Sequence, residues 1–338
     1  MTNIKKNRKI TVALLFGGDS FEHEVSVVSG RAIDKGLDRE KYDVILIYID
    51  YQGRWIRLEE SDQLVGVQTS VEDALLGVDV AFPAFHGPLG EDGAFQGLCK
   101  LFNTPFVGSD VLSSSICYDK VACKQMLGFH KIPIVPYAWF YSTTPIPYES
   151  LTCNLGTTLF IKPANSGSSV GISKVRTVGE YEKAIELASK YDSKIVVERA
   201  IEGREIELAI LGNQELVISK PGEIVSKRDF YDYEAKYIDP DGAKLIVPAQ
   251  IDISLSEIAE RGYRACFCEG LARIDFLVSH SGEVFLNEIN TIPGFTPISL
   301  FPKLMMLEGF LYSELLDRLI ELALEPHVVR KPVQSITK

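Results

Sequence analysis

Hydrophobic runs alternate with a helical pattern over the first hundred residues. Residues 10–16, 42–50 and 78–85 are rich in Val, Ile and Phe, as buried strands are. The residues between the first two runs, 25–37, carry a helical pattern. Strands that alternate with helices predict a parallel α/β sheet, in which ligands bind at the carboxyl ends of the strands.

A second pattern of helix and strands begins near residue 113. A helical stretch over residues 114–128 is followed by a proline-rich extended segment. Thr177 and Glu180 have the spacing of a capping box, which predicts the start of a helix over residues 181–190. Four strands are expected around them, over residues 158–164, 194–200, 205–211 and 214–219.

The last part of the chain begins near residue 220 and contains an aromatic segment, residues 230–237. The hydrophobic pattern then predicts a strand, a helix, a hairpin and a final amphipathic helix, over residues 244–247, 256–271, 272–289 and 311–324. The chain should therefore divide into three units, residues 1–112, 113–219 and 220–338.

Composition places the chain among globular proteins and narrows its partners. Its 338 residues are 46% hydrophobic and 24% charged, and the net charge of -11 disfavours a nucleic-acid partner. No run of about 18 apolar residues occurs, so no membrane span is expected. The six cysteines form no CxxC pair, which favours reduced core thiols and a cytoplasmic protein.

The hairpin carries the most informative chemistry. If its turn centres on residues 281–282, Asp275 faces Glu288 and Arg273 faces Asn290. Two opposed carboxylates repel each other and need a cation or water between them. Oxygen ligands of this kind suit Mg²⁺, completed by phosphate oxygens. A solvated hairpin face is an equally good interpretation of the spacing.

Strand alternation also predicts which side chains of the hairpin share a face. Leu277 and Leu286 are expected beside the four polar residues. The opposite face is expected to carry Ile274, Phe276, Phe285 and Ile289.

A glycine- and serine-rich segment follows one of the predicted strands. The run KPANSGSSVG, from Lys162 to Gly171, contains two glycines and three serines, whose N–H and O–H groups can close over phosphate. It is neither a P-loop nor a dinucleotide fingerprint, because it lacks GKS/T and no helical pattern follows. A plain connector is the alternative.

Single residues add further candidates, each with a structural alternative. Lys120 and Lys162 could neutralise phosphate, and Glu198 with Glu205 could hold an adenine amine and ribose hydroxyls. Each could also be ordinary surface charge.

Three segments could serve the substrate. Glu22 opens a helix and could take a substrate ammonium, while the N-terminus of that helix could take an anion. His86 ends a strand in a glycine-rich turn. The aromatic residues 230–237, with an embedded lysine, suit a lid that excludes water. Structural roles remain open for all three.

The order of these motifs resembles that of the D-alanine–D-alanine ligases, an ATP-grasp family. The resemblance covers roughly residues 10–324 and rests on GGDSFEHEVS, FHGPLGEDGAFQG, YDK at Tyr118–Lys120, FIKPANSGSSVGISKV, DFYDYEAKY, ARIDF and NEINTIPGFTPISL. It implies a three-domain α/β ATP-grasp fold whose N-terminal domain is Rossmann-like with a parallel sheet. It also implies a cytoplasmic homodimer that makes a peptidoglycan precursor.

The resemblance assigns the candidates to three groups. Nucleotide contacts would come from Lys120, Lys162, Ser168, Ser169, Glu198, Arg199, Ala200, Ile201, Glu205, Phe230, Lys236, Leu277, Asn287 and Glu288. Two Mg²⁺ ions, or Mn²⁺, would be held by Asp275, Glu288 and Asn290. D-Alanine would be bound by Glu22, His86, Ser299 and Leu300.

The implied reaction has two steps. The carboxylate of the first D-alanine attacks the γ-phosphate of ATP and becomes an acyl phosphate, and the amine of the second D-alanine then attacks that carbonyl. Arg273 and the Gly294 N–H would stabilise the oxyanion. Glu22 would hold the first amino group, with Ser168 and Tyr237 linked to it by hydrogen bonds.

The residues that would choose the second substrate match the alanine-specific type. These are Tyr237 and the pair Ser299-Leu300. The D-lactate type tends to have a histidine in the lid, and the D-serine type has an arginine in place of Leu300. Two positions depart from the family pattern. Pro297-Ile298 stands where many relatives have Ser-His, and Arg199 stands where a lysine is frequent. A D-alanine–D-lactate or D-serine ligase is the nearest alternative, and a non-catalytic ATP-binding regulatory module is an alternative of another class.

Overall fold

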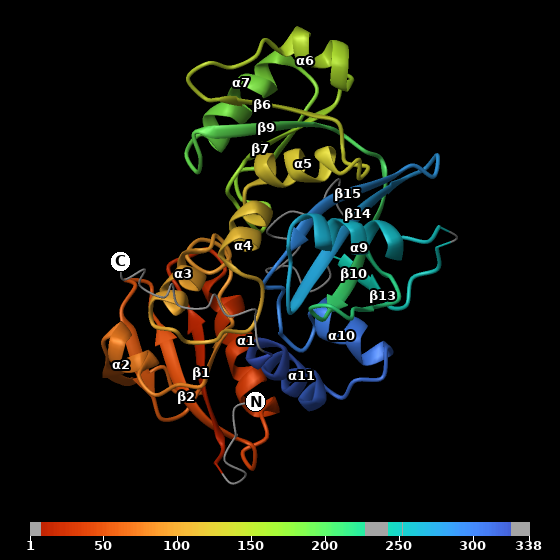
Figure 1. The fold of residues 1–338 in the computed structure, drawn as a ribbon. Helices are drawn as coiled ribbons and strands as arrows, with labels where there is room; N and C mark the ends of the chain where they lie inside the picture. Colours follow the sequence, from red (N-terminus) through yellow and green to blue (C-terminus); the bar gives the residue numbers. More distant parts are fainter. Residues whose placement is uncertain (1–7, 227–242, 252, 326–338) are drawn as a thin grey trace, which may run out of the picture.

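The computed structural model describes residues 8–226, 243–251 and 253–325, which form three sheets with flanking helices (Figure 1). In the first sheet, of order β4-β3-β2-β1-β5, β1 pairs in parallel with β2 and β5, as predicted. The prediction of an all-parallel sheet is wrong at the other edge, where β2 pairs with β3 and β3 with β4 in antiparallel fashion. Its strands are β1 (Ile10–Gly17), β2 (Tyr42–Ile49), β3 (Trp55–Leu58), β4 (Gly66–Gln68) and β5 (Val80–Pro83). The helices of this part are α1 (His23–Gly36), α2 (Val71–Leu75) and α3 (Ala94–Leu101).

The last helix, α11 (Tyr312–Leu324), returns to the first sheet. It lies beside α1 in Figure 1, and its buried leucines belong to the same hydrophobic core as Leu14 and Phe16. The Tyr42 hydroxyl donates a hydrogen bond of 2.8 Å to Asp317 on this helix. The end of the described chain therefore helps to bury its beginning.

The second sheet is antiparallel, of order β6-β9-β7-β8, and lies at the top of Figure 1. Its strands are β6 (Tyr137–Tyr141), β7 (Leu159–Pro163), β8 (Ser173–Val175) and β9 (Lys194–Arg199). Helices α6 (Tyr148–Leu155) and α7 (Val178–Ala188) pack on it. The predicted capping box of Thr177 and Glu180 is present at the start of α7.

The single helix predicted over residues 114–128 is wrong. The chain forms two helices, α4 (Val111–Tyr118) and α5 (Lys120–Phe129). Asp119 has an extended backbone between them, and its carboxylate accepts hydrogen bonds from the N–H groups of Val121 and Ala122. An N-cap inside an otherwise helical pattern starts a new helix there.

The third sheet has the order β13-β12-β10-β14-β15, with β11 paired to β10. Its strands are β10 (Gly203–Leu211), β11 (Val217–Ile218), β12 (Gly222–Ser226), β13 (Ala243–Ile246), β14 (Leu271–Ser279) and β15 (Val284–Asn290). Helices α9 (Ser256–Ala265) and α10 (Leu300–Leu307) complete this part. The predicted strands after residue 203 thus pair within this sheet, and the boundaries at residues 112 and 219 stay predictions.

Helix α9 is shorter than the predicted helix over residues 256–271. Phe267 has a positive φ of 57°, and the N–H of Cys268 bonds to the Tyr263 carbonyl. A left-handed residue just after the last turn ends a helix.

The hairpin has the predicted register at its functional end, where Asp275 lies opposite Glu288. A β-bulge after Asp275 then shifts the pairing, so that Phe276 faces Leu286 and Leu277 faces Phe285. The predicted faces of Leu286 and Phe285 are therefore wrong, because the extra bulged residue reverses the alternation. Leu286 is buried in the core with Phe276.

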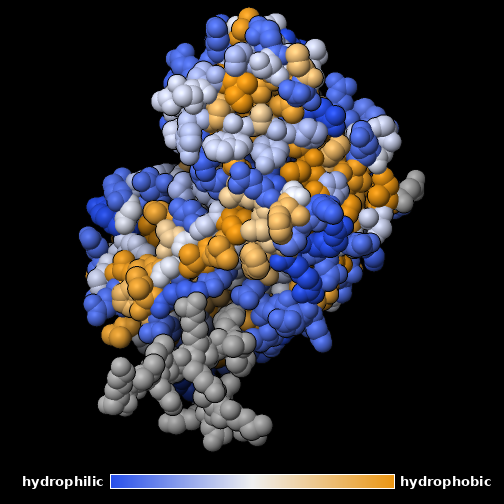
Figure 2. Space-filling model, turned by 45° about the horizontal axis from the view of Figure 1, so that its top comes forward, coloured by the Kyte–Doolittle hydropathy of each residue, from blue (hydrophilic) through white to orange (hydrophobic). Residues whose placement is uncertain are grey.

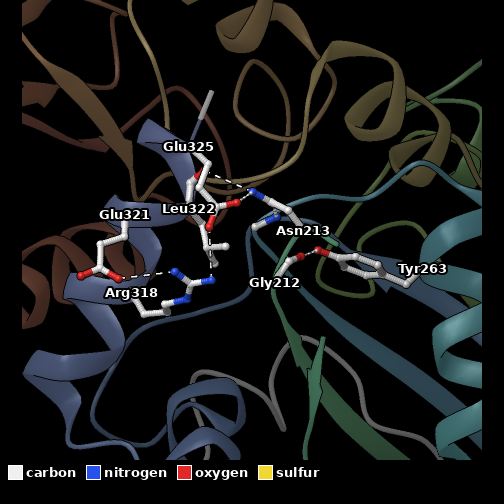
Figure 3. Close-up of polar contacts among 8 residues, drawn as sticks. Gly212, Asn213, Tyr263, Arg318, Glu321, Leu322 and Glu325 are labelled. Carbon is white, nitrogen blue, oxygen red and sulfur yellow. Dashed lines mark hydrogen bonds and ion pairs between the residues drawn. The ribbon is translucent and has the colours of Figure 1, made fainter. Parts of the chain in front are cut away.

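A polar network joins the end of α11 to the third sheet (Figure 3). The Asn213 amide donates hydrogen bonds to the Leu322 carbonyl, at 3.2 Å, and to the Glu325 carboxylate, at 2.8 Å. Beside it, the Tyr263 hydroxyl donates to the Gly212 carbonyl at 2.8 Å. The network fixes the last helix relative to strand β10.

On the face shown in Figure 2, hydrophobic residues lie in small groups among hydrophilic ones. Among the helices of the described part, none combines the length and the apolar character required to cross a bilayer.

Candidate active site

A cavity of about 1400 Å³ is lined by residues from all three sheets and their loops. Phe230, Lys236 and Tyr237 lie outside the described residues. Every other candidate lines this cavity: Glu22, His86, Lys120, Lys162, Ser168, Ser169, Glu198, Arg199, Ala200, Ile201, Glu205, Arg273, Asp275, Leu277, Asn287, Glu288, Asn290, Gly294, Ser299 and Leu300. Residues far apart in the sequence are therefore brought together at one site.

A buried carboxylate between two lysines lies at the second sheet. The Glu198 carboxylate is 2.8 Å from the Lys124 ammonium and 2.6 Å from the Lys162 ammonium. Burial opposes the ionisation of Glu198, but the two ammonium groups outweigh it and hold the pKa of Glu198 at about 2. Burial also opposes the charge of Lys162, yet Glu198 raises the pKa of Lys162 above its ordinary value. Glu198 and Lys162 are therefore both ionised at neutral pH.

Lys120 begins α5 directly after the Asp119 cap and points toward the glycine- and serine-rich loop. Its ammonium donates to the Ser166 carbonyl in that loop. Burial lowers the pKa of Lys120; Glu288 acts in the opposite direction, and the neighbouring Lys162 lowers the pKa further. A buried cation next to a second cation provides a place for a polyanion such as a nucleotide phosphate.

The glycine- and serine-rich loop reaches across the cavity to the first unit. Ser168 and Ser169 have positive φ angles of 50° and 60°, so the loop turns sharply. The Ser168 hydroxyl donates a hydrogen bond to the Glu22 carboxylate. The contact that the resemblance implied between these two residues is thus present.

Arg273 lies between two carboxylates of the third sheet, Asp275 and Glu207. Its guanidinium donates to both oxygens of Asp275, at 2.8 and 2.7 Å, and lies 3.0 Å from Glu207. Burial opposes its charge, but Asp275 and Glu207 raise the pKa of Arg273 well above its ordinary value. Sequence reasoning missed Glu207, which strand alternation places on the same face of β10 as Glu205.

Hard oxygen donors line the hairpin side of the cavity. Asp275 and Glu288 are register partners, and the Asn290 amide donates to Asp275 at 3.0 Å. No group of three or more His, Cys, Asp and Glu residues forms a metal site within the described ranges. Two carboxylates and an amide fit Mg²⁺ only if phosphates complete its coordination, which is the usual arrangement in nucleotide sites.

His86 is buried and presents one ring nitrogen to the site. Its Nδ1 lies 2.9 Å from the Ile292 carbonyl, which can only accept, so Nδ1 carries the hydrogen and Nε2 is the acceptor. Within the described part of the chain, Nε2 has no hydrogen-bond partner. Burial lowers the pKa of His86, which keeps the ring neutral.

Glu91 is a further carboxyl group of the cavity that sequence reasoning missed. It accepts a 2.8 Å hydrogen bond from the Gly87 N–H. Burial, and then the charge of Glu22, raise the pKa of Glu91 to about 8. Its position in the GEDG run, five residues after His86, was the available signal.

The N-terminus of α10 forms the far end of the cavity. The Ser299 hydroxyl lies 2.7 Å from the Thr296 hydroxyl and accepts a hydrogen bond from the Thr296 N–H. A β-carbon at Gly294 would come within 2.8 Å of the Ser299 hydroxyl, so glycine leaves room there. Leu300 is buried beside this helix start, where backbone N–H groups can receive a carboxylate.

The comparisons with known proteins agree along nearly the whole chain. Two family models match, "D-ala D-ala ligase N-terminus" over residues 11–109 and "D-ala D-ala ligase C-terminus" over residues 127–321. A D-alanine–D-alanine ligase of Shouchella clausii is 44% identical over 97% of this chain and 98% of that protein.

Solved structures share the fold. The D-alanine–D-alanine ligase of Coxiella burnetii has a TM-score of 0.80 at 34% identity, over 94% of this chain and 95% of that one. The VanG D-Ala:D-Ser ligase of Enterococcus faecalis has a TM-score of 0.83 at 35% identity, over 94% and 100%. The expected α/β ATP-grasp fold is confirmed. The chain belongs to the D-alanine–D-alanine ligase family.

Proposed function

We propose that this chain joins two D-alanines to D-alanyl-D-alanine with ATP, for the synthesis of a peptidoglycan precursor. The observation that carries the proposal is one cavity in which buried lysines, an arginine held by carboxylates, and Glu22 converge. These are the groups needed to bind a polyanionic nucleotide, to stabilise an oxyanion and to hold an ammonium. Family membership supports the same reaction.

The nucleotide would lie between the second and third sheets. Lys120 and Lys162 would bind its phosphates, together with Ser168 and Ser169 of the loop. Adenosine would contact Glu198, Glu205 and Leu277, along with residues 199–201. Phe230 and Lys236 are proposed to complete the nucleotide site from outside the described residues.

Asp275, Glu288 and Asn290 would hold two Mg²⁺ ions, with Mn²⁺ as a possible substitute. When bound, the metal would neutralise phosphate charge and so favour attack on the γ-phosphate. The Asn287 position, next to Glu288 at the bulge, would border the phosphates.

The first D-alanine would bind through its ammonium to Glu22, whose carboxylate is oriented by Ser168. His86 lines the same cavity, and among the described residues its acceptor Nε2 has no hydrogen-bond partner. Tyr237 is proposed to complete this set from outside the described residues. The carboxylate of this D-alanine is then free to attack the γ-phosphate, which breaks the bond to the β-phosphate, releases ADP and gives the acyl phosphate.

The second D-alanine would bind at the start of α10. Its carboxylate would lie at Ser299 and the helix N-terminus, and its methyl group against Leu300. The neutral amine attacks the acyl phosphate carbonyl, and Arg273 with the Gly294 N–H would stabilise the resulting oxyanion. The intermediate then breaks its C–O bond to phosphate, which leaves with a proton from the attacking nitrogen, and the dipeptide remains. A cytoplasmic location, a homodimer and the three-unit division are part of the proposal and rest on the resemblance.

A D-alanine–D-serine ligase is the second candidate, because the VanG structure is so similar. The test is phosphate release and product identity with ATP, Mg²⁺ and D-alanine, alone and with D-serine or D-lactate added. D-Alanine alone should drive phosphate release and give the dipeptide. Product that forms only with D-serine or D-lactate would replace the proposal with that ligase. Tight ATP binding without any turnover would instead indicate a regulatory module.

A further inference from the structure

The Glu198 carboxylate is shared between two cations, one for each oxygen. Lys124 of α5 lies 2.8 Å from Oε1, and Lys162 of β7 lies 2.6 Å from Oε2. The side chains of Lys124 and Glu198 are only 2% and 3% exposed, and that of Lys162 is 13% exposed. The group carries a net charge of +1 in a place from which water is largely excluded.

The two lysines differ in what they can reach. Lys162 lines the cavity, whereas Lys124 is not among its lining residues and stands over the Tyr137 ring at 5.6 Å. Lys124 follows Lys120 by four residues, so both project from the same side of α5. A nucleotide phosphate can therefore attract Lys162, while Lys124 stays behind Glu198.

The difference between the two lysines decides whether Glu198 keeps a counter-ion when a nucleotide binds. If Lys162 leaves Glu198 for a phosphate, Lys124 and Glu198 remain as a neutral buried pair. Without Lys124, the same movement would leave a buried carboxylate with no cation, which is strongly unfavourable. Lys162 would then stay on Glu198, and the phosphate would lose a cation.

We infer that Lys124 is a positioning residue for nucleotide binding: it is the permanent counter-ion of Glu198 that releases Lys162 to the nucleotide phosphates. The inference rests on the proposed function only in taking a nucleotide phosphate as the new partner of Lys162.

The test measures binding without turnover. Titration calorimetry of the full chain, without D-alanine, gives dissociation constants for ATP and for adenosine. Lys124→Met should weaken ATP binding by at least about tenfold and leave adenosine binding unchanged, because adenosine does not draw Lys162 away. Lys124→Arg should restore ATP binding. Equal weakening of ATP and adenosine, or unchanged ATP binding, would overturn the inference.

A matched control comes from the same two elements. Lys194 of β9 pairs with Asp119, the cap of α5, and neither residue lines the cavity. Lys194→Met removes a lysine–carboxylate ion pair there and should leave both constants unchanged. If Lys124→Met does not fold, Lys124→Gln replaces it with the same expected split between ATP and adenosine.

A mutant cycle separates positioning from general damage. With Glu198→Gln there is no buried carboxylate to neutralise, so adding Lys124→Met should change ATP binding little. Full additivity of the two effects would contradict the inference. Because no dipeptide is measured, a wild-type chain that binds ATP but makes no dipeptide would refute the proposed function and leave this inference standing.

Discussion

At the scale of the residue, the charges of the cavity are held by one another. Arg273 is fixed by Asp275 and Glu207, and Glu198 by two lysines. Truncating one member of such a buried set leaves the charge of the others uncompensated. The resulting loss in free energy of folding is larger than the contribution of a surface ion pair.

Glu198 should make stability depend on pH in the acid range. Its folded pKa of about 2 lies below the ordinary value of 4.5. The stabilisation is therefore present above about pH 4.5 and is lost as the pH falls toward 2. The difference in unfolding free energy between the wild type and Glu198→Gln should shrink over this window, as measured by urea denaturation at several pH values. A difference that stays constant with pH would contradict the pKa.

Ser168 should act on the first D-alanine through Glu22, in addition to its proposed contact with the phosphates. Its hydrogen bond to Glu22 orients the carboxylate that is proposed to take the substrate ammonium. Ser168→Ala should raise the KM for the first D-alanine by about tenfold or more, since hydrogen bonds to charged groups are strong. Steady-state kinetics at saturating ATP measure this, so that the proposed contact of Ser168 with the phosphates does not affect the comparison. An unchanged KM for D-alanine would show that this contact does not serve the substrate.

At the scale of the element, the junction between α11 and the third sheet depends on Asn213. Its amide donates to Leu322 and Glu325, and its carbonyl accepts from the Gly270 N–H at 2.9 Å. Asn213→Ala should lower the free energy of unfolding by about 1–3 kcal/mol, the range for a lost set of half-buried hydrogen bonds.

The control for this substitution is Asn154→Ala. Asn154 is exposed, and among the described residues its side chain bonds to the Ser150 carbonyl of its own helix. Urea denaturation of both variants should show the loss for position 213 alone. Equal stability of the two variants would mean that the junction in Figure 3 does not hold α11 in place.

The elements also show where sequence reasoning stops. Period-two alternation correctly placed Asp275 opposite Glu288, but it cannot reveal the bulge that turns Leu286 into the core. The break at Asp119 depends on one capping side chain within a pattern that is otherwise helical. A capping side chain or a bulge changes the local backbone, whereas the hydrophobic pattern of the sequence stays the same and does not reveal the change.

At the scale of the whole molecule, the site depends on contacts between units that are distant in sequence. Motif order identified the family, and every candidate residue in the described part of the chain lines the cavity. Sequence reasoning did not find three residues of the site, Lys124, Glu207 and Glu91. Their importance arises only when helix α5, strand β10 and the GEDG turn come together in the folded chain. The spacing of residues along the sequence does not predict how close these side chains lie in the folded protein.

The proposed reaction requires that an acyl phosphate of D-alanine forms in this cavity. Its most direct test is turnover of ATP and Mg²⁺ with D-alanine that carries oxygen-18 in its carboxylate, followed by mass spectrometry of the released phosphate. Each released phosphate should carry one labelled oxygen, which is transferred when the carboxylate attacks the γ-phosphate. Dipeptide formed together with unlabelled phosphate would contradict it.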